Sequence, residues 1–179
     1  MLGHHTKTPA RWPPMHMLVG EGAAMTPRPD EEVLARTGPF LRGLHSQWKS
    51  AAAAAGDVPD RSVLTPERLR PWLGSVSVYH ETADADFVIR LDGTRIVAWT
   101  GEDWTNRRLS ELDTRYGRDL LGSCRRACDA RCPAFGLPIL PFQSETKVMH
   151  RMILPVLSAD RTRRQILLAL WPADDPRRQ

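Results

Sequence analysis

The amino-acid sequence predicts an α+β domain in which several helices are inserted into one antiparallel sheet. Two observations carry this prediction: a helical period of apolar residues from Phe40 to Ala55, and five segments with strand character after residue 74. A chain of 179 residues suits one domain and buries a sizeable core. We therefore expect a single folded domain.

The composition is 41% hydrophobic and 26% charged, which is typical of a soluble globular protein. No apolar run approaches the roughly 18 residues of a membrane span. The apolar stretch at residues 15–25 is interrupted by Gly20, Glu21 and Gly22, so it does not form a signal-peptide core. We expect a cytoplasmic protein with no membrane partner.

The domain is expected at residues 39–172, between a flexible leader at residues 1–38 and a C-terminal tail at residues 173–179. The leader is rich in proline and methionine and shows no sustained period, which is typical of an unfolded segment. Met25 offers a later start of translation, so the sequence leaves open whether residues 1–24 are translated.

The residues after Pro39 predict an amphipathic helix that Gly56 ends. Its apolar residues recur at helical spacing: Phe40, Leu41, Leu44, Trp48, Ala51, Ala52 and Ala55. A short helix follows, with Thr65 as its cap and Pro66 at its first position. Gly74 limits the extent of this second helix.

Two strands, Ser75–Glu81 and Asp86–Leu91, are predicted next, joined by a polar turn that suits a hairpin. In the second strand, alternation places Phe87, Ile89 and Leu91 on one face. This shared face is expected to point toward the helices that follow.

After Asp92 and Gly93 the apolar spacing changes to that of a helical turn, which Gly101 closes. A longer helix is predicted at Gly117–Arg131. Its apolar face consists of Leu120, Leu121, Cys124, Ala127 and Cys128.

Three more strands complete the predicted sheet: Ala134–Phe142, 147–157 and 165–171. The first contains Pro138 and Pro141, which cannot donate to a ladder and therefore favour a sheet edge. In the other two strands, both alternating sets of residues are apolar, so each strand presents apolar side chains to both faces of the sheet. This predicts that both faces of the sheet are covered. The first helix is the natural cover for one of these faces.

Three segments of the chain, residues 58–80, 86–112 and 151–171, resemble a bacterial family of small single-domain PAS proteins, and the resemblance extends from Phe40 to Trp171. Its most specific part is "RLDGTRI" at residues 90–96, followed by a Gly-x-Asp-x-Thr stretch at residues 101–105. The family usually continues with glycine where this chain has Asn106. Asparagine tolerates a left-handed backbone better than most residues, so we expect the turn to survive.

The resemblance implies the PAS fold: a five-stranded antiparallel sheet with strand order 2-1-5-4-3, short helices across one face, and a cavity between helices and sheet. The residues that it places around this cavity are Ile89, Leu91, Arg95, Ile96, Trp99, Leu109, Leu120, Cys124, His150, Met152 and Leu168. Such a cavity would bind a small molecule.

Arg95 is the strongest hydrogen-bond donor expected near this cavity, and its guanidinium suits a carboxylate or carbonyl ligand. The alternative is that Arg95 pairs with Glu111 or Asp113 at the surface. His150 is a pocket candidate because it shares strand parity with Met152. A lone strand histidine is more often packed than bound to haem.

The cysteines Cys124, Cys128 and Cys132 recur every four residues, which predicts small hydrophobic side chains facing the sheet. Zinc would need a second ligand pair, and none is present. Redox sensing would need an exposed thiol of low pKa, which the sequence leaves open. A flavin photosensor needs an Asn-Cys-Arg helix, whereas this chain has Ser123-Cys124-Arg125, so neither haem nor flavin is supported and the cofactor stays unassigned.

No catalytic motif is present, so the sequence predicts a non-enzymatic regulatory module that binds a small molecule, a signalling protein partner, or both. A homodimer is expected through one face of the first helix, unless these residues cover their own sheet. They are Phe40, Leu41, Leu44 and Trp48.

The alternative function is that of a basic nucleic-acid adaptor, since the net charge is +4. Its contacts would come from Arg125, Arg126, Arg161, Arg163 and Arg164. These arginines are scattered rather than massed, which makes solvated surface the better interpretation. Nucleic acid is therefore not the expected partner.

Overall fold

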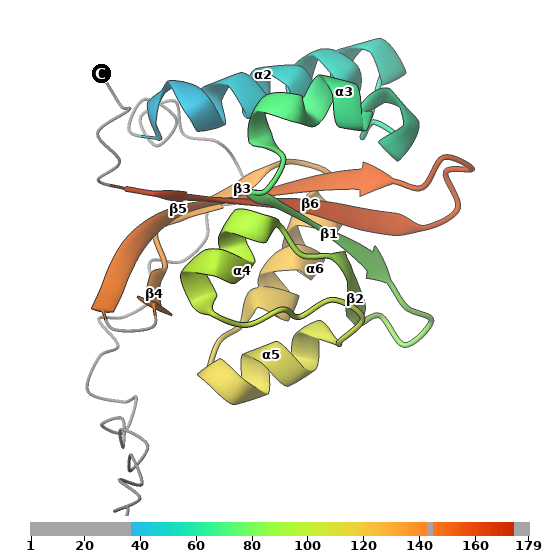
Figure 1. The fold of residues 1–179 in the computed structure, drawn as a ribbon. Helices are drawn as coiled ribbons and strands as arrows, with labels where there is room; N and C mark the ends of the chain where they lie inside the picture. Colours follow the sequence, from blue (N-terminus) through green and yellow to red (C-terminus); the bar gives the residue numbers. More distant parts are fainter. Residues whose placement is uncertain (1–36, 143–144, 174–179) are drawn as a thin grey trace, which may run out of the picture.

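A computed structural model describes residues 37–142 and 145–173 (Figure 1). Most of the predicted leader and tail lies outside these residues. The helices are α2 Gly38–Ala55, α3 Pro66–Leu69, α4 Thr94–Thr100, α5 Leu109–Tyr116 and α6 Leu120–Ala130, with short 3₁₀ turns η2 Arg61–Val63 and η3 Arg70–Trp72. The strands are β1 Val76–Glu81, β2 Phe87–Leu91, β3 Ala134–Gly136, β4 Ile139–Phe142, β5 Glu145–Leu157 and β6 Arg164–Pro172.

The strands form one antiparallel sheet in the order β2-β1-β6-β5-β3, with β4 paired to β5 beside this path. The predicted α+β class and antiparallel sheet are confirmed. The predicted strand Ala134–Phe142 is divided into β3 and β4, so the sheet has six strands instead of five. Pro138 lies in the break, where it cannot donate to the ladder and its carbonyl accepts from the Met149 amide at 2.9 Å.

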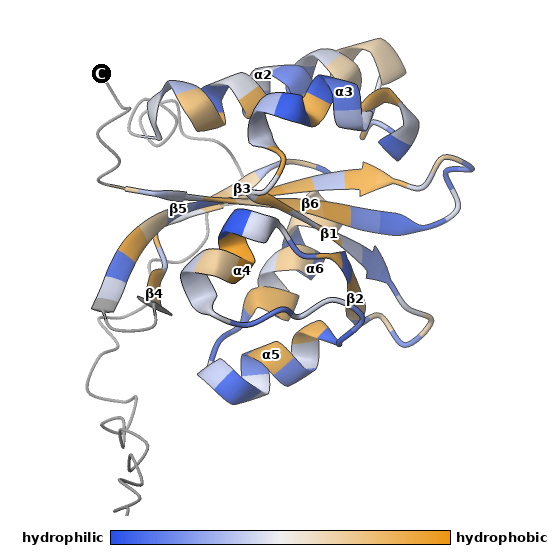
Figure 2. Cartoon of the chain, in the orientation of Figure 1, coloured by the Kyte–Doolittle hydropathy of each residue, from blue (hydrophilic) through white to orange (hydrophobic). Residues whose placement is uncertain are grey.

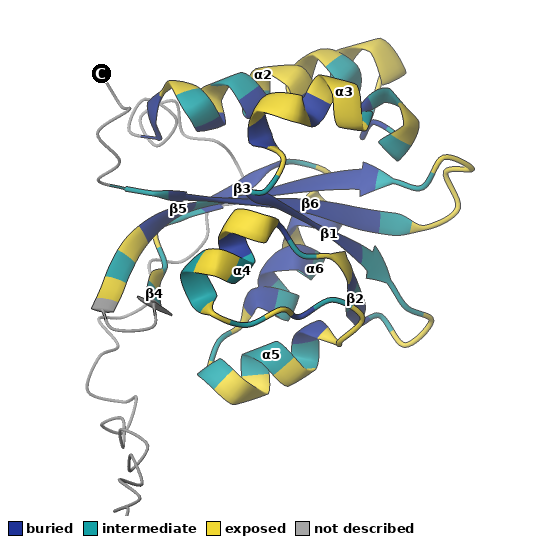
Figure 3. Cartoon of the chain, viewed as in Figure 1, coloured by how far each residue is buried: buried dark blue, intermediate teal, exposed yellow. Residues whose placement is uncertain are grey.

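Both faces of the sheet are covered, as the apolar parity of the last two strands predicts (Figures 1 and 3). Helices α2 and α3 lie on one face, and α4, α5 and α6 lie on the other. We call α4–α6 with the connecting residues 101–108 the roof. The core beneath the roof includes Phe87, Ile89, Ile96, Trp104, Leu109, Cys124, Met149, Ile153 and Leu168, and the core beneath α2 includes Leu41, Leu44, Trp48, Val78, Met152, Leu154 and Trp171.

Helix α2 covers the sheet of its own chain. Leu41 and Leu44 are fully buried there, and the Trp48 indole donates to the carbonyl of Pro155 at 2.7 Å. The expectation that these three side chains form a dimer surface needs correction, because the sheet already occupies the apolar face of α2. Gly56, with a left-handed φ of 67°, ends the helix as predicted.

A β-bulge changes the faces of strand β2. Val78 pairs with Leu91 whereas Tyr79 pairs with Ile89, which leaves Arg90 as the extra residue. Ile89 is consequently buried beneath the roof, but Leu91 is 48% exposed. The prediction that Leu91 shares a face with Ile89 is therefore wrong, because simple alternation does not hold across a bulge.

The long helix of the roof, α6, begins at Leu120, three residues later than the predicted Gly117–Arg131. Gly117 adopts a left-handed φ of 59° and ends α5, and the Asp119 carboxylate then caps α6 by accepting from the Gly122 amide. The short helix α3 has its predicted cap, since the Thr65 hydroxyl accepts from the Arg68 amide. Within the described ranges, no helix combines the length and the apolar character that crossing a membrane would require.

Candidate functional site

The chain folds back over its own sheet directly after β2, as the resemblance implies, and the change of apolar period there marks the start of α4. Ile96, Trp104 and Leu109 are 6%, 3% and 0% exposed and pack with Ile89 beneath the roof. The end of the connecting segment also touches the edge of β2, where the Asn106 amide donates to the carbonyl of Ile89 at 2.6 Å. The end of this segment is thus held against β2.

The corner at Asp92 and Gly93 holds the roof to the sheet. One carboxylate oxygen of Asp92 accepts from the Ser77 hydroxyl at 2.6 Å, and the other accepts from the Trp104 amide at 3.3 Å. Burial raises the pKa of Asp92, while the hydrogen bond from Ser77 opposes that shift. The Asp92 carboxylate therefore joins β1, the corner and the roof.

The turn that follows α4 keeps the geometry expected of the Gly-x-Asp-x-Thr stretch. Asn106 has a φ of 66°, so asparagine supplies the left-handed residue at the position where the resembled family has glycine. The Asp103 carboxylate accepts from the Thr105 amide at 2.9 Å. The substitution at position 106 leaves the turn intact.

The structure gathers most of the predicted pocket residues beneath the roof: Ile89, Ile96, Leu109, Leu120, Cys124 and Leu168, with Trp99 at the margin. Met152 belongs instead to the core beneath α2, and His150 shares its strand parity. Alternation along β5 gives the roof face to Met149, Arg151 and Ile153, so the placement of His150 and Met152 in the pocket needs correction.

The space beneath the roof is filled by side chains. Phe87, Leu109, Cys124 and Met149 are fully buried there. Two hollows in the described part of the chain, of about 490 and 390 Å³, both lie elsewhere on the surface. Neither of these two hollows therefore offers a ligand site in this core, and the half-buried Trp99 lies at its margin.

Two polar residues beneath the roof escaped the sequence analysis, Tyr79 and Arg151. Burial raises the pKa of the Tyr79 hydroxyl well above its usual range. Burial lowers the pKa of Arg151, whose charge faces Cys124 and Tyr79. The signal that could have found this site is the charge of Arg151 two residues after Met149, on the same side of an otherwise apolar strand.

The cysteines fall into two groups. Cys124 and Cys128 are buried in the core beneath the roof, which confirms their interpretation as small hydrophobic side chains. Burial raises the pKa of Cys128 to about 12 and that of Cys124 well above its usual range. Cys132 lies beyond the end of α6 and is half-buried.

We expect a maleimide at pH 8 to label the folded protein at Cys132 only, because the two buried thiols stay protonated and inaccessible. Mass spectrometry of the labelled chain should show one adduct, and three after unfolding in denaturant. Cys132→Ser should abolish the single adduct whereas Cys128→Ser should keep it; labelling of folded Cys132→Ser would contradict the assignment.

Arg95 is exposed and lies with its guanidinium carbon 5.7 Å from the centroid of the Trp171 ring. It therefore does not point into the core beneath the roof. The surface pairing considered from the sequence is also wrong, because Glu111 binds Arg107 and the Asp113 carboxylate accepts from the amides that begin α6.

Aromatic side chains connect the roof to α2 around the end of the sheet. Trp99 of α4 meets Trp171 of β6 edge to face, with ring centroids 6.2 Å apart. Phe40 of α2 stacks on the same Trp171 ring at 3.7 Å, and the Trp72 indole donates to the Phe40 carbonyl at 2.7 Å. Trp99 packs against both cores, so α4 contacts the two layers at once.

The arginines proposed for nucleic-acid binding mostly have partners within the chain. Arg164 pairs with Glu81 and Asp129, Arg126 with Asp119, and Arg161 with Asp60, while Arg125 donates to the carbonyl of Ala85. Their charges are therefore largely compensated, which weighs against a nucleic-acid surface at these residues.

Comparison with known proteins adds one finding. A family model described as a PAS domain matches residues 37–171, which is most of the chain and nearly all of its described part. No curated protein and no solved structure matches this sequence. The family match agrees with the resemblance carried by residues 58–80, 86–112 and 151–171.

Proposed function

We propose that this chain, which belongs to the PAS domain family, is a regulatory module that passes a change of packing beneath its roof to helix α2. Membership of the family indicates a sensory or regulatory role. The observation that carries the finer proposal is the contact of α4 with both cores, through Ile96 on one side and the Trp99–Trp171–Phe40 contacts on the other. No catalytic activity belongs to this proposal.

The path begins at α4. Ile96 and Trp99 are three residues apart, so they lie on one face of the helix and move together when the helix shifts. Trp171 stacks on Phe40, and therefore a displacement of Trp99 changes the packing at the start of α2. Packed side chains of this kind transmit a change when they have two alternative arrangements.

The proposed input is a small molecule or a change of packing at the margin of the roof. Tyr79 and Arg151 would recognise an acidic or carbonyl group, because a neutral phenol and a guanidinium both donate hydrogen bonds. The proposed output is a signalling partner that binds the outer side of α2, where Arg42 and Lys49 are exposed. The aromatic contacts at Phe40 lie at one end of that surface.

Hydrogen exchange tests the path. Ile96→Val and Ile153→Val remove the same methyl group beneath the roof, but only Ile96 belongs to α4. We expect Ile96→Val to speed amide exchange in residues 38–45 more than Ile153→Val does, and we expect Trp171→Leu to abolish that difference. Equal exchange in the two valine variants would refute the path.

Native mass spectrometry of freshly purified protein, with an absorption spectrum, tests the input. A retained molecule that Arg151→Met releases would support ligand binding beneath the roof. A bare chain that also fails to bind added small acids would restrict the module to protein partners.

A further inference from the structure

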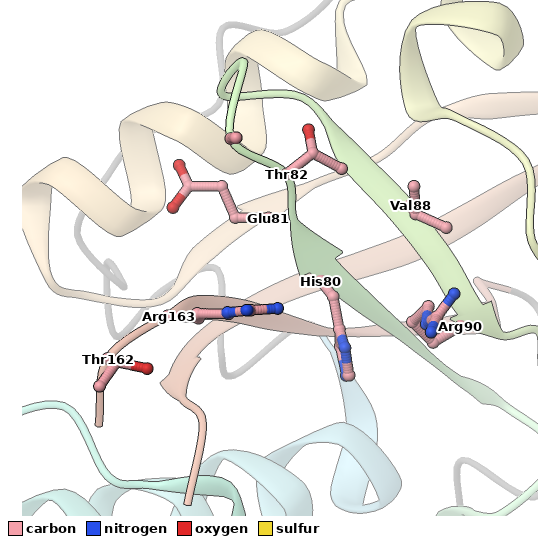
Figure 4. A pocket seen from close by; sticks show the side chains of 8 residues that line it. His80, Glu81, Thr82, Val88, Arg90, Thr162 and Arg163 are labelled. Atoms are coloured by element: carbon pink, nitrogen blue, oxygen red, sulfur yellow. The ribbon is translucent and has the colours of Figure 1, made fainter. Parts of the chain in front are cut away.

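A groove of about 490 Å³ opens on the side of the sheet where α2 and α3 lie, at the end of the β1–β2 hairpin (Figure 4). It is lined by His80 of β1, Val88 and Arg90 of β2, and Thr162 and Arg163 of the β5–β6 connection. Figure 2 shows that the end of β1 and the start of β6 are hydrophilic, in contrast to the middle of the sheet. This groove plays no part in the function proposed above.

The groove carries excess positive charge. Arg90 and Arg163 lie on opposite sides of His80, and Arg61 of η2 is close enough to act on the same imidazole. Glu81 also lines the groove, but its side chain points away from His80, and the Arg164 guanidinium binds its carboxylate with Nε at 2.8 Å from one oxygen. The acidic residue is thus already neutralised.

The two flanking guanidiniums have hydrogen-bonding capacity to spare. Within the described ranges, the Arg163 side chain donates no hydrogen bond, and the Arg90 side chain makes one long contact, 3.5 Å to the amide oxygen of Asn106. The nearby Asp160 carboxylate accepts from the Ser158 hydroxyl and the Thr162 amide. The Arg90 and Arg163 guanidiniums and the His80 imidazole therefore line one groove. The nearby carboxylates of Glu81 and Asp160 already accept from donors of the chain.

We propose that this groove binds a phosphate dianion, either free phosphate or the phosphate group of a small monoester. Each guanidinium fork matches two phosphate oxygens, and His80 between them supplies a further donor when protonated. A carboxylate has only two oxygens and cannot engage donors from three sides equally well. The volume of about 490 Å³ leaves room for the organic part of an ester beside the phosphate.

His80 reports on occupancy. Burial together with the charges of Arg90, Arg61 and Arg163 lowers the pKa of His80 below its ordinary 6.5. Glu81 on the same strand is held by Arg164, so it does not offset these charges. A bound dianion opposes the three arginines, and the pKa of His80 must then rise.

NMR titration of the His80 imidazole in the full chain tests the proposal, with His80→Gln used to assign its signal. We expect inorganic phosphate or phenyl phosphate to give a saturable shift and a raised His80 pKa, and acetate at equal ionic strength to give neither. Arg90→Gln and Arg163→Gln should each weaken binding about tenfold, the scale of one charge-assisted hydrogen bond. Arg126→Gln, which removes an equal charge from α6 outside the groove, should leave binding unchanged.

Equal affinities for the two probes would assign free phosphate, and tighter binding of phenyl phosphate would assign a monoester. The proposal is overturned if neither probe saturates a shift at about 10 mM, an affinity weaker than any specific site of this kind needs. It is also overturned if acetate matches phosphate, or if Arg126→Gln weakens binding as much as Arg90→Gln does. Thermal unfolding of each variant verifies that the exposed substitutions leave the fold intact.

Discussion

Gly93→Ala is expected to destabilise the protein by about 3 kcal/mol or more, which is the range of severe steric disruption in a folded core. A Cβ at this position would overlap the carbonyl oxygen of Gly74 and lie 2.8 Å from that of Val76. The Gly74 carbonyl cannot withdraw easily, because it accepts from the amides of Arg95 and Ile96 at 2.8 and 3.2 Å. Chemical denaturation measures the loss.

Gly117→Ala is the matched control for Gly93→Ala. Gly117 has a left-handed φ of 59° and no atom within 4 Å of an added Cβ, so only backbone strain of about 1 to 2 kcal/mol is expected. A larger loss at Gly93 than at Gly117 supports close packing of the corner on β1. Similar losses would show that the corner yields, and the account of how the roof is held would fail.

Trp48→Ala is expected to cost about 3 to 5 kcal/mol, as for other large aromatic side chains removed from a core. The substitution empties the contact between α2 and the sheet and leaves the Pro155 carbonyl without its indole donor. The protein should lose α2 or unfold as a whole, which circular dichroism during urea titration detects.

Lys49→Ala is the matched control, because Lys49 follows Trp48 in the sequence but lies on the exposed side of α2. This substitution should change the free energy of unfolding by less than about 0.5 kcal/mol. Sedimentation of both variants separates a core role from a dimer role. If Trp48→Ala keeps wild-type stability and only lowers the mass in solution, Trp48 belongs to an interface between chains and its placement on the sheet is refuted.

Local patterns predicted the elements of this fold well, because each has a chemical cause within a few residues. The helical period from Phe40 to Ala55 predicts α2. The last two strands are apolar on both faces, which predicts a sheet that is covered on both sides. The change of period after Gly93 gives helix α4. The left-handed turn at Asn106 was expected from the resembled family's glycine at this position together with the tolerance of asparagine for that backbone.

What the sequence could not supply depends on pairing between distant residues. The bulge at Arg90 turns Leu91 away from Ile89, and it becomes visible only when β1 and β2 are aligned. The same holds for β5. The sequence shows that His150 and Met152 lie on one face of this strand, but it does not show that this face points away from the roof. Arg151 was not among the predicted pocket residues, although Met149 and Ile153, which share its side of the strand, lie in the core beneath the roof.

The groove around His80 has a similar origin. Arg61, Arg90 and Arg163 come from three separate parts of the chain, and the sequence shows no basic cluster that unites them. Arg163 was considered only as part of a run with Arg161 and Arg164. The fold separates these neighbours, since Arg164 binds Glu81 and Arg161 lies near Asp60.

The central claim is that the roof and α2 are coupled through Trp171, and a double-mutant cycle between Trp99→Leu and Phe40→Leu measures it most directly. Trp99 and Phe40 can be coupled without direct contact, because both side chains contact the Trp171 ring. We predict a coupling free energy of about 0.5 kcal/mol or more with Trp171 present, and none in the Trp171→Leu background. Additivity of the two substitutions to within about 0.3 kcal/mol with Trp171 present would contradict the account.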